Sequence, residues 1–236
     1  YKRQNSERIL GAILFKDTML KEINNLPTAI YLWEKLQIVP FLKIDQGLRS
    51  SENQAQLLKP INDLKTSLEL AKKNKVFGTK MRSLINGANN IGIKDLVDQQ
   101  FDIGEEILSF GLLPIIEPEV DITIPDKREA EDMLYNNIKR RLDRIESSKK
   151  VILKLSLPEQ DNFYEPLTQH PNILRIVALS GGFEKKIAVN KLKQNKKMIA
   201  SFSRALTEGL KSDTPKQEFE EQLDRTVQSI YEASLS

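Results

Sequence analysis

The chain has 236 residues, of which 39% are hydrophobic, so it can bury the core of one large domain or two small ones. Its 36 basic and 33 acidic residues give a net charge of +3, and the basic residues are spread along the chain, which gives no footprint for nucleic acid. It has no cysteine, no apolar run long enough to span a membrane and no signal-like N-terminus. We therefore expect a soluble protein of the cytoplasm, free of disulfides.

Seven apolar runs predict β-strands, and amphipathic helical stretches separate them. The predicted strands are Ile9–Phe15, Ile38–Ile44, Val76–Arg82, Leu112–Glu119, Val151–Leu157, Ile173–Leu179 and Met198–Ser203. Strands that alternate with helices indicate parallel β–α–β units. The sequence therefore predicts an α/β fold in a single domain.

Three of the helices have recognisable boundaries. Apolar residues keep helical spacing through Ile93–Phe110. Asp126 and Glu129 have the spacing of a capping box at the start of a second helix. Pro215 suits the first turn of a last helix, which we expect at about residues 215–233.

The number of strands leaves the architecture open. A closed (β/α)8 barrel needs eight β–α units, and the sequence supplies seven. Only eight residues precede the first predicted strand. Either the sheet is open, or the strand that would close a barrel lies outside this chain, and the strand count alone favours an open sheet.

Charged side chains recur where consecutive predicted strands end. They are Lys43 and Asp45, Lys80 and Arg82, and Glu117 and Glu119. Within each pair the two side chains share a face, because strand side chains alternate. A single pair is more often a solvated strand end, but repetition on neighbouring strands is typical of a barrel active site, which lies at the carboxyl ends of the strands.

Lys154 lies inside the apolar run Val151–Leu157, which predicts a buried strand. A buried ammonium costs free energy unless it is paired or neutralised. A lysine close to a second cation is shifted toward its neutral, nucleophilic form. The alternative is a lysine that extends along an edge or pairs with a glutamate, but the apolar residues on both sides argue against a solvated face.

A candidate phosphate site follows the sixth predicted strand. It consists of Ser180, Gly181 and Gly182. Backbone N–H groups of glycines at the start of a helix can bind an anion, although a tight strand-to-helix turn explains the same residues. Arg204, after the next strand, can add a bidentate contact. Lys43 and Arg82 are candidates for a second anion site on the opposite side.

The sequence gives little support for metal chemistry. Zinc sites usually need several histidines or cysteines, and His170 is the single histidine, next to Pro171 in a predicted loop. Glu117 and Glu119 can hold magnesium, but nothing selects for it. No Walker, G-x-S-x-G or G-x-G-x-x-G motif occurs. We therefore expect neither a metal ion nor a cofactor.

Several short strings occur in a fixed order along the chain. They are ILGAILFKDTM, FLKIDQGL, FGTKMRS, PIIEPEV, VILKLSLP, ALSGG and ASFSRAL. In these strings the chain resembles class I (Schiff-base) fructose-1,6-bisphosphate aldolases, especially the bacterial branch. The resemblance covers nearly the whole chain and implies a (β/α)8 TIM barrel, with seven of its eight units in a single domain over residues 1–236.

The resemblance reverses the preference for an open sheet. The family's first strand carries an aspartate in a motif similar to L-D-Q-S-G-G-S, and that motif is absent here. We therefore expect an additional N-terminal segment of about 40–60 residues, roughly one β–α unit. That segment would supply the eighth strand and the aspartate that takes part in carbon–carbon cleavage.

The resemblance also implies roles for individual residues. Lys154 matches the lysine that forms an imine with the substrate ketone. Glu117 matches the carboxylate that helps to form and dehydrate the carbinolamine, and Glu119 matches the carboxylate beside it. Lys80 matches the second active-site lysine.

The resemblance implies phosphate-binding roles as well. Lys43 and Arg82 match residues near the phosphate far from the ketone. The pocket for the ketone-side phosphate is implied for Ser180, Gly181, Gly182 and Arg204.

These matches imply a metal-independent lyase of glycolysis and gluconeogenesis. It would cleave fructose 1,6-bisphosphate reversibly to dihydroxyacetone phosphate and glyceraldehyde 3-phosphate, so its partner is a phosphorylated ketose, with no nucleic acid and no membrane. One alternative is an aldolase for a related ketose bisphosphate such as tagatose 1,6-bisphosphate. Another is a non-catalytic binding protein on the same scaffold. The oligomeric state stays open, a homo-oligomer included.

Overall fold

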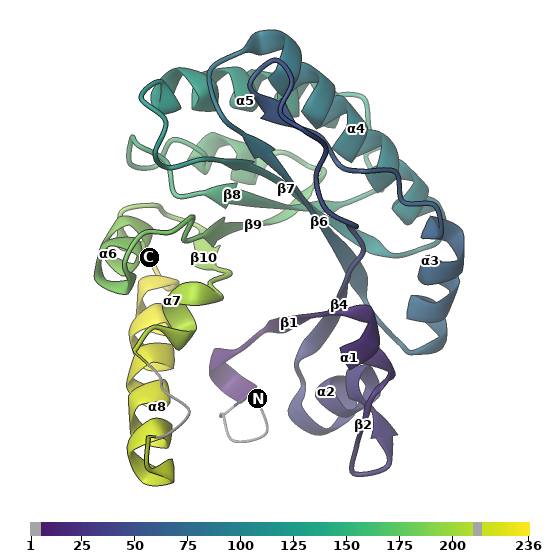
Figure 1. Cartoon of the computed structure of the whole chain (residues 1–236), viewed down its shortest axis with the longest axis vertical. Helices are drawn as coiled ribbons and strands as arrows, with labels where there is room; N and C mark the ends of the chain where they lie inside the picture. The colour runs from purple at the N-terminus through teal and green to yellow at the C-terminus, as the bar shows by residue number, and fades with distance from the viewer. Residues whose placement is uncertain (1–5, 210–213) are drawn as a thin grey trace.

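Seven parallel strands form the centre of the structure, a computed structural model that describes residues 6–209 and 214–236. Across the sheet they are β1 (Gly11–Leu14), β4 (Val39–Lys43), β6 (Gly78–Ile85), β7 (Leu113–Val120), β8 (Val151–Ser156), β9 (Ile173–Leu179) and β10 (Met198–Ala200). This order follows the chain, and the sheet curls on itself (Figure 1). The seven predicted strands are confirmed, and the fold is a partial (β/α)8 barrel.

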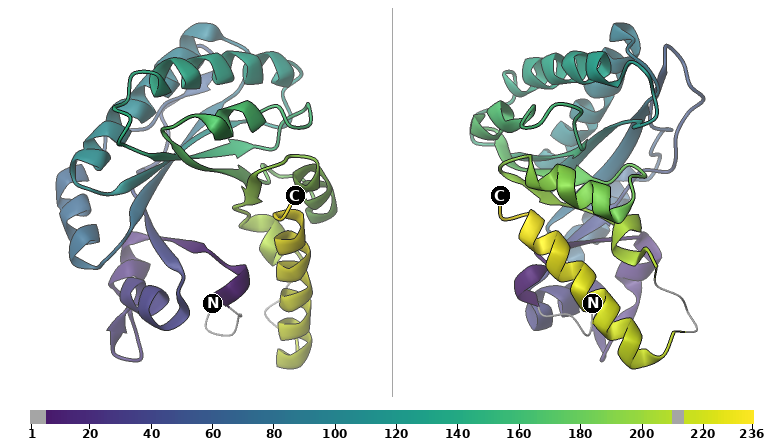
Figure 2. Two further views of the ribbon diagram at one scale, coloured as in Figure 1. Left: turned by 180° about the vertical axis from the view of Figure 1, so that it is seen from behind. Right: turned by 90° about the vertical axis from the view of Figure 1, so that its left-hand side faces the viewer.

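Helices cover the outer, convex face of the curled sheet (Figures 1 and 2). They are α1 (Lys16–Leu20), α2 (Thr28–Leu36), α3 (Leu64–Lys73), α4 (Asn90–Ser109), α5 (Lys127–Leu142), α6 (Lys185–Lys193), α7 (Arg204–Thr207) and α8 (Lys216–Ala233), with short 3-10 helices η1 (Ser6–Arg8) and η2 (Glu165–Gln169). None of the helices in the described ranges has the length and hydropathy that a membrane span requires.

The structure adds short strands and corrects one helix cap. The strands β2 (Glu22–Ile23) and β3 (Leu26–Pro27) form a hairpin, and β5 (Ala55–Gln56) pairs antiparallel with β6. Two residues are too few to show a strand periodicity in the sequence. The predicted capping box is wrong, because Asp126 makes no side-chain cap and instead accepts a hydrogen bond of 2.7 Å from the Ala88 N–H.

The side chains that face the inside of the barrel form two layers. Near the amino ends of the strands the layer is apolar and contains Ile13, Val39, Phe41, Leu113, Ile115, Ile152, Val177 and Ile199. Two residues further along their strands, Phe41, Ile115 and Ile152 are followed by charged residues. Because side chains two apart share a face, the same strands carry an apolar floor and a charged layer above it.

Gly78 leaves room for this apolar floor. A Cβ at this position would lie 2.9 Å from the ring of Phe41 and 2.1 Å from the Leu113 carbonyl oxygen. The missing side chain therefore lets Phe41 occupy the inside of the barrel beneath Lys80, which lies two residues beyond Gly78.

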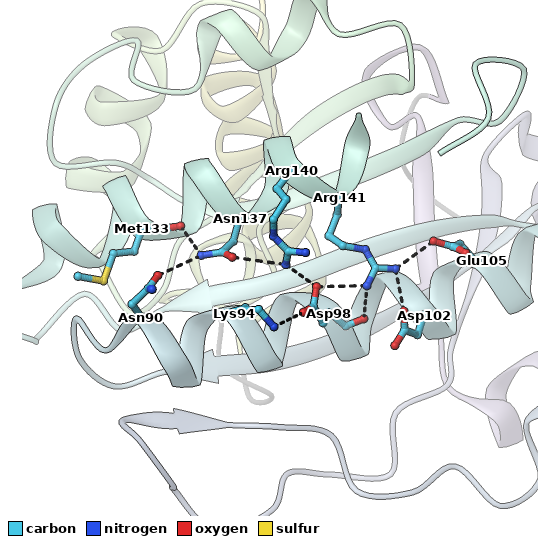
Figure 3. A network of polar contacts seen from close by, with 9 residues as sticks. All are labelled: Asn90, Lys94, Asp98, Asp102, Glu105, Met133, Asn137, Arg140 and Arg141. Atoms are coloured by element: carbon cyan, nitrogen blue, oxygen red, sulfur yellow. Dashed lines mark hydrogen bonds and ion pairs between the residues drawn. The ribbon is translucent and has the colours of Figure 1, made fainter. Parts of the chain in front are cut away.

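A polar network on the outside fastens α5 to α4 (Figure 3). The Asp98 carboxylate of α4 lies 3.0 Å from Lys94, 2.5 Å from Arg140 and 3.2 Å from Arg141. Arg141 also pairs with Asp102, at 2.7 Å. Both helices flank β7, so the network stabilises the packing over the middle of the sheet.

The sheet has two edges, because β1 pairs only with β4 and β10 only with β9 among the described residues. Elements from the two ends of the chain nevertheless meet beside this opening (Figure 1). The Arg8 guanidinium of η1 lies 2.5 Å from Asp224 and donates a 3.0 Å hydrogen bond to Gln228, both on α8.

Candidate active site

Lys154 lies in the middle of β8 and points into the charged layer. It is 8% exposed, and its Nζ is 3.2 Å from Oε1 of Glu117 on β7. Burial lowers the pKa of Lys154, the Glu117 carboxylate opposes that change, and the Lys80 ammonium lowers the pKa further. The sequence predicted both the burial and the influence of a second cation, and burial is the larger cause.

Glu117 lies between two lysines. Its Oε2 is 3.0 Å from the Lys80 Nζ on β6, while its other oxygen faces Lys154. Glu117 is 3% exposed and Lys80 is 8% exposed. The two lysines provide the charged partners that a carboxyl group so deeply buried needs.

The row of charges continues to β4. Lys80 Nζ is 3.9 Å from Asp45 Oδ2, and Lys43 Nζ is 2.6 Å from Asp45 Oδ1. The signs therefore alternate along the row Lys154, Glu117, Lys80, Asp45 and Lys43, which crosses four neighbouring strands. We refer to these five residues as the charged row.

Asp45 is the member of the row that the sequence placed among the strand-end charges without predicting a role in the site for it. Its side chain is only 6% exposed, and it bridges two lysines on different strands. The available signal was its spacing, since Asp45 lies two residues after Lys43 in the same way that Glu119 lies two after Glu117.

Arg82 and Glu119 form a second pair beyond the row. The Arg82 Nε donates to Glu119 Oε2, and the hydrogen bond to Glu119 raises the pKa of Arg82 although burial opposes this. Glu119 is 7% exposed, whereas 37% of the Arg82 side chain is exposed. Glu119 therefore holds Arg82 at the solvent side of the buried charges.

The residues Ser180, Gly181 and Gly182 follow β9 directly, on the strand next to the one that carries Lys154. Gly181 and Gly182 have φ angles of +61° and +112°, which favour glycine. A Cβ on Gly182 would lie 3.9 Å from both terminal nitrogens of Arg204. The turn and the guanidinium are thus neighbours, as the sequence predicted.

One boundary here differs from the prediction. The last strand ends at Ala200 rather than Ser203, and Arg204 is the first residue of the short helix α7. The Ser201 N–H still donates a 2.8 Å hydrogen bond to the Ala178 carbonyl oxygen of β9, but the strand does not continue beyond it, and Arg204 is an exposed helix residue instead of a strand end.

A cavity of about 360 Å³ opens at the carboxyl ends of β1 and β4. Its lining includes Phe15, Lys16, Lys43, Asp45 and Asp63. The Lys43 Nζ lies 5.8 Å from the centre of the Phe15 ring. The cavity therefore borders the end of the charged row that is furthest from Lys154.

His170 lies outside this constellation. Its Nε2 is 3.1 Å from Asp143 Oδ1, and its Nδ1 accepts a 3.2 Å hydrogen bond from the Asn172 N–H. These contacts precede β9, at the opposite end of the strands from Ser180. In the part of the chain that the structure describes, no three His, Cys, Asp or Glu side chains gather as a metal site.

A barrel with a buried lysine beside a carboxylate at the carboxyl ends of its strands has the layout of enzymes that use an amine nucleophile. Curated relatives define the family further. The chain is 50% identical to fructose-bisphosphate aldolase class 1 of Clostridium acetobutylicum and of Synechocystis sp., over 98% of its length and over 79% and 77% of theirs. It is 48% identical to the enzyme of that name from Porphyromonas gingivalis, over 97% of the chain and 77% of that protein. The chain belongs to the class 1 fructose-bisphosphate aldolase family.

A solved structure agrees with this assignment at the level of the fold. A fructose-bisphosphate aldolase from Plasmodium falciparum, in complex with TRAP and a small-molecule inhibitor, superimposes with a TM-score of 0.76 at 17% identity. The match covers 98% of this chain and 78% of that one. No protein-family model matches the chain.

Proposed function

We propose that the protein cleaves fructose 1,6-bisphosphate reversibly to dihydroxyacetone phosphate and glyceraldehyde 3-phosphate, with Lys154 as the nucleophile. The observation that carries the proposal is the buried Lys154 amine, whose pKa is lowered and whose Nζ lies 3.2 Å from Glu117. A neutral amine is required for attack on a ketone, and burial favours that neutral form. Family membership supports the choice of substrate.

The reaction divides into steps that the charged row can serve. The neutral Lys154 nitrogen adds to the C2 carbonyl, and Glu117, within hydrogen-bond reach of that nitrogen, moves protons so that the carbinolamine loses water. The resulting iminium accepts the electron pair of the C3–C4 bond as the C4 hydroxyl loses its proton. The aldehyde leaves, the enamine is protonated at C3, and hydrolysis restores the amine.

Two anion sites fit a bisphosphate that reacts at C2. Ser180, Gly181, Gly182 and Arg204 lie after β9 and β10, and β9 adjoins the strand of Lys154. We assign this pocket to the C1 phosphate, which is one carbon from the reacting ketone. We assign Lys43 and Arg82 to the C6 phosphate, because β4 lies three strands from β8. Binding energy from both phosphates can hold the open-chain sugar in line for the reaction.

The proposal requires no metal ion and no organic cofactor, since the iminium itself withdraws the electrons. Fructose 1,6-bisphosphate is an intermediate of glycolysis, so we propose that the protein works in the cytoplasm.

Reductive trapping tests the proposal. Borohydride added with dihydroxyacetone phosphate should attach a stable mass to the peptide that contains Lys154. Lys154→Met should lose both the label and cleavage while it still binds the bisphosphate, whereas Lys149→Met, which changes an exposed lysine before the same strand, should behave as wild type. A label on another lysine of active protein would refute the assignment. Parallel assays with tagatose 1,6-bisphosphate measure the preference between the two sugars.

A further inference from the structure

Gln100 is a fully buried polar residue on the face of α4 that packs against the sheet. Its neighbours on that face, Leu96, Val97 and Phe101, are apolar and at most 1% exposed. An amide in such surroundings costs free energy unless its groups are hydrogen-bonded. Leucine or methionine would fill this buried position equally well, so packing does not explain why the side chain carries an amide.

The Gln100 amide holds the backbone of one residue on β7, and that residue is Glu117. Gln100 Oε1 accepts a 2.9 Å hydrogen bond from the Glu117 N–H, and its Nε2 donates 3.0 Å to the Glu117 carbonyl oxygen. The same Nε2 lies 2.9 Å from the buried Ser83 Oγ on β6. Gln100 is therefore hydrogen-bonded to a side chain of β6 and to the backbone of β7.

Side chains also hold the strand just beyond Glu117. Pro118 has no N–H to donate. The Ser156 Oγ of β8 accepts 3.0 Å from the Val120 N–H and donates 2.6 Å to the Val120 carbonyl oxygen. The segment that carries Glu117 and Glu119 is thus held at both ends by side chains from neighbouring elements.

We propose that Gln100 is a positioning residue for Glu117, because its two hydrogen bonds fix the peptide groups on both sides of the Cα that carries this carboxylate. The inference rests on the proposed function, in which Glu117 moves protons at the Lys154 nitrogen. The carboxylate lies 3.2 Å from Lys154 and 3.0 Å from Lys80, so a small rotation of the peptide would break one of these contacts.

Gln99 provides a matched control on the same helix. Its Oε1 accepts 2.8 Å from the Leu58 N–H and its Nε2 donates 3.1 Å to the Leu58 carbonyl oxygen. It therefore makes the same two-point contact to a backbone that carries no candidate site residue. Gln99→Met and Gln100→Met each remove a two-point contact to a strand or loop backbone, Gln100→Met also removes the bond to Ser83, and only Gln100→Met should disturb Glu117.

The experiment measures steady-state cleavage of fructose 1,6-bisphosphate, the rate of borohydride trapping and the midpoint of urea unfolding for both variants. In Gln100→Met we expect kcat to fall roughly 10- to 100-fold, as for a catalytic group displaced by about 1 Å, with little change in KM. Trapping should slow in parallel. Gln99→Met, at a part-buried residue with two hydrogen bonds, should lose less stability than Gln100→Met and keep kcat within about twofold of wild type.

The inference is overturned if folded Gln100→Met keeps wild-type kcat, or if the two variants lose activity equally. If Gln100→Met does not fold, Ser83→Ala removes the anchor of the Gln100 Nε2 and carries the test. It should lower kcat about two- to fivefold, and an unchanged kcat also overturns the inference. Failure of wild-type protein to be trapped at Lys154 would instead refute the proposed function, so the two failures are distinguishable.

Discussion

At the scale of single residues, the proposed role of Lys154 as a nucleophile requires a buried lysine in its uncharged form, and the charged row bears on that requirement. With Lys154 protonated, three lysines face two carboxylates. With Lys154 neutral, Lys43 and Lys80 balance Asp45 and Glu117. Burial and the Lys80 ammonium both lower the pKa of Lys154 and so favour the uncharged amine that attack on a carbonyl requires, whereas the Glu117 carboxylate opposes them.

Glu117→Gln tests this electrostatic argument. The side chains that face Lys154 are Glu117 and Glu119 on β7 and Lys80 on β6. A carboxylate at Glu117 opposes the lowered pKa of Lys154, so its removal should lower that pKa further. Since the amine must be neutral to react, the acid limb of the kcat/KM profile should move to lower pH.

The same variant should lower kcat by roughly 10²- to 10⁴-fold, because an amide cannot transfer the proton. Glu146→Gln, at an exposed carboxylate, is the control and should leave the pH profile unchanged. If the acid limb of the kcat/KM profile of Glu117→Gln moved to higher pH, Glu117 could not be the group that raises the pKa of Lys154.

At the scale of secondary-structure elements, one carboxylate, Asp98, meets three cations in the network between α4 and α5 (Figure 3). Although burial raises the pKa of Asp98, hydrogen bonds from Arg140, Lys94 and Arg141 outweigh it and lower the pKa to about 2. In the unfolded chain this carboxylate has a pKa of about 3.9. The stabilisation is therefore complete above that value and is lost as the pH falls toward 2.

Asp98→Asn should lower the free energy of unfolding by about 1 kcal/mol at pH 7, a figure reduced for solvent screening. The difference in the free energy of unfolding between Asp98→Asn and wild type should decrease below pH 4 and become small near pH 2. Urea titrations across this range provide the measurement. Asp102 is 70% exposed and pairs with Arg141, so Asp102→Asn should lower the free energy of unfolding by less than Asp98→Asn does. Equal losses of stability in the two variants would contradict the central role of Asp98.

The sequence allowed most of these elements to be predicted, because each of the seven strands is a distinct apolar run. It failed where the structure depends on side-chain choices between elements. Asp126 has the spacing of a capping box, yet it bonds to the Ala88 N–H. Gln100 is inconspicuous in the sequence, since nothing local shows that a helix amide reaches the backbone of a strand.

At the scale of the whole molecule, the site arises from the superposition of two layers inside one curled sheet. Period-two alternation places Lys154 above Ile152, Glu117 above Ile115 and Lys43 above Phe41. Repetition on parallel strands brings these ends together, which is why the strand-end charges that the sequence singled out lie side by side in the structure. Asp45 shared the pattern, but its bridging position depends on the register between β4 and β6.

The contact between η1 and α8 has a consequence for the order in which the molecule assembles. Arg8 and Asp224 are separated by 216 positions, so their meeting closes a very long loop of the chain. Closing a loop of such span costs conformational entropy, and this contact is held by partly exposed polar groups, so we expect it to form late in folding and to open readily. We expect amide hydrogens of η1 and α8 to exchange faster than those of β6, β7 and β8. Arg8→Ala should accelerate exchange at the two ends alone, and uniform acceleration across the sheet would show instead that this contact belongs to the global folding unit.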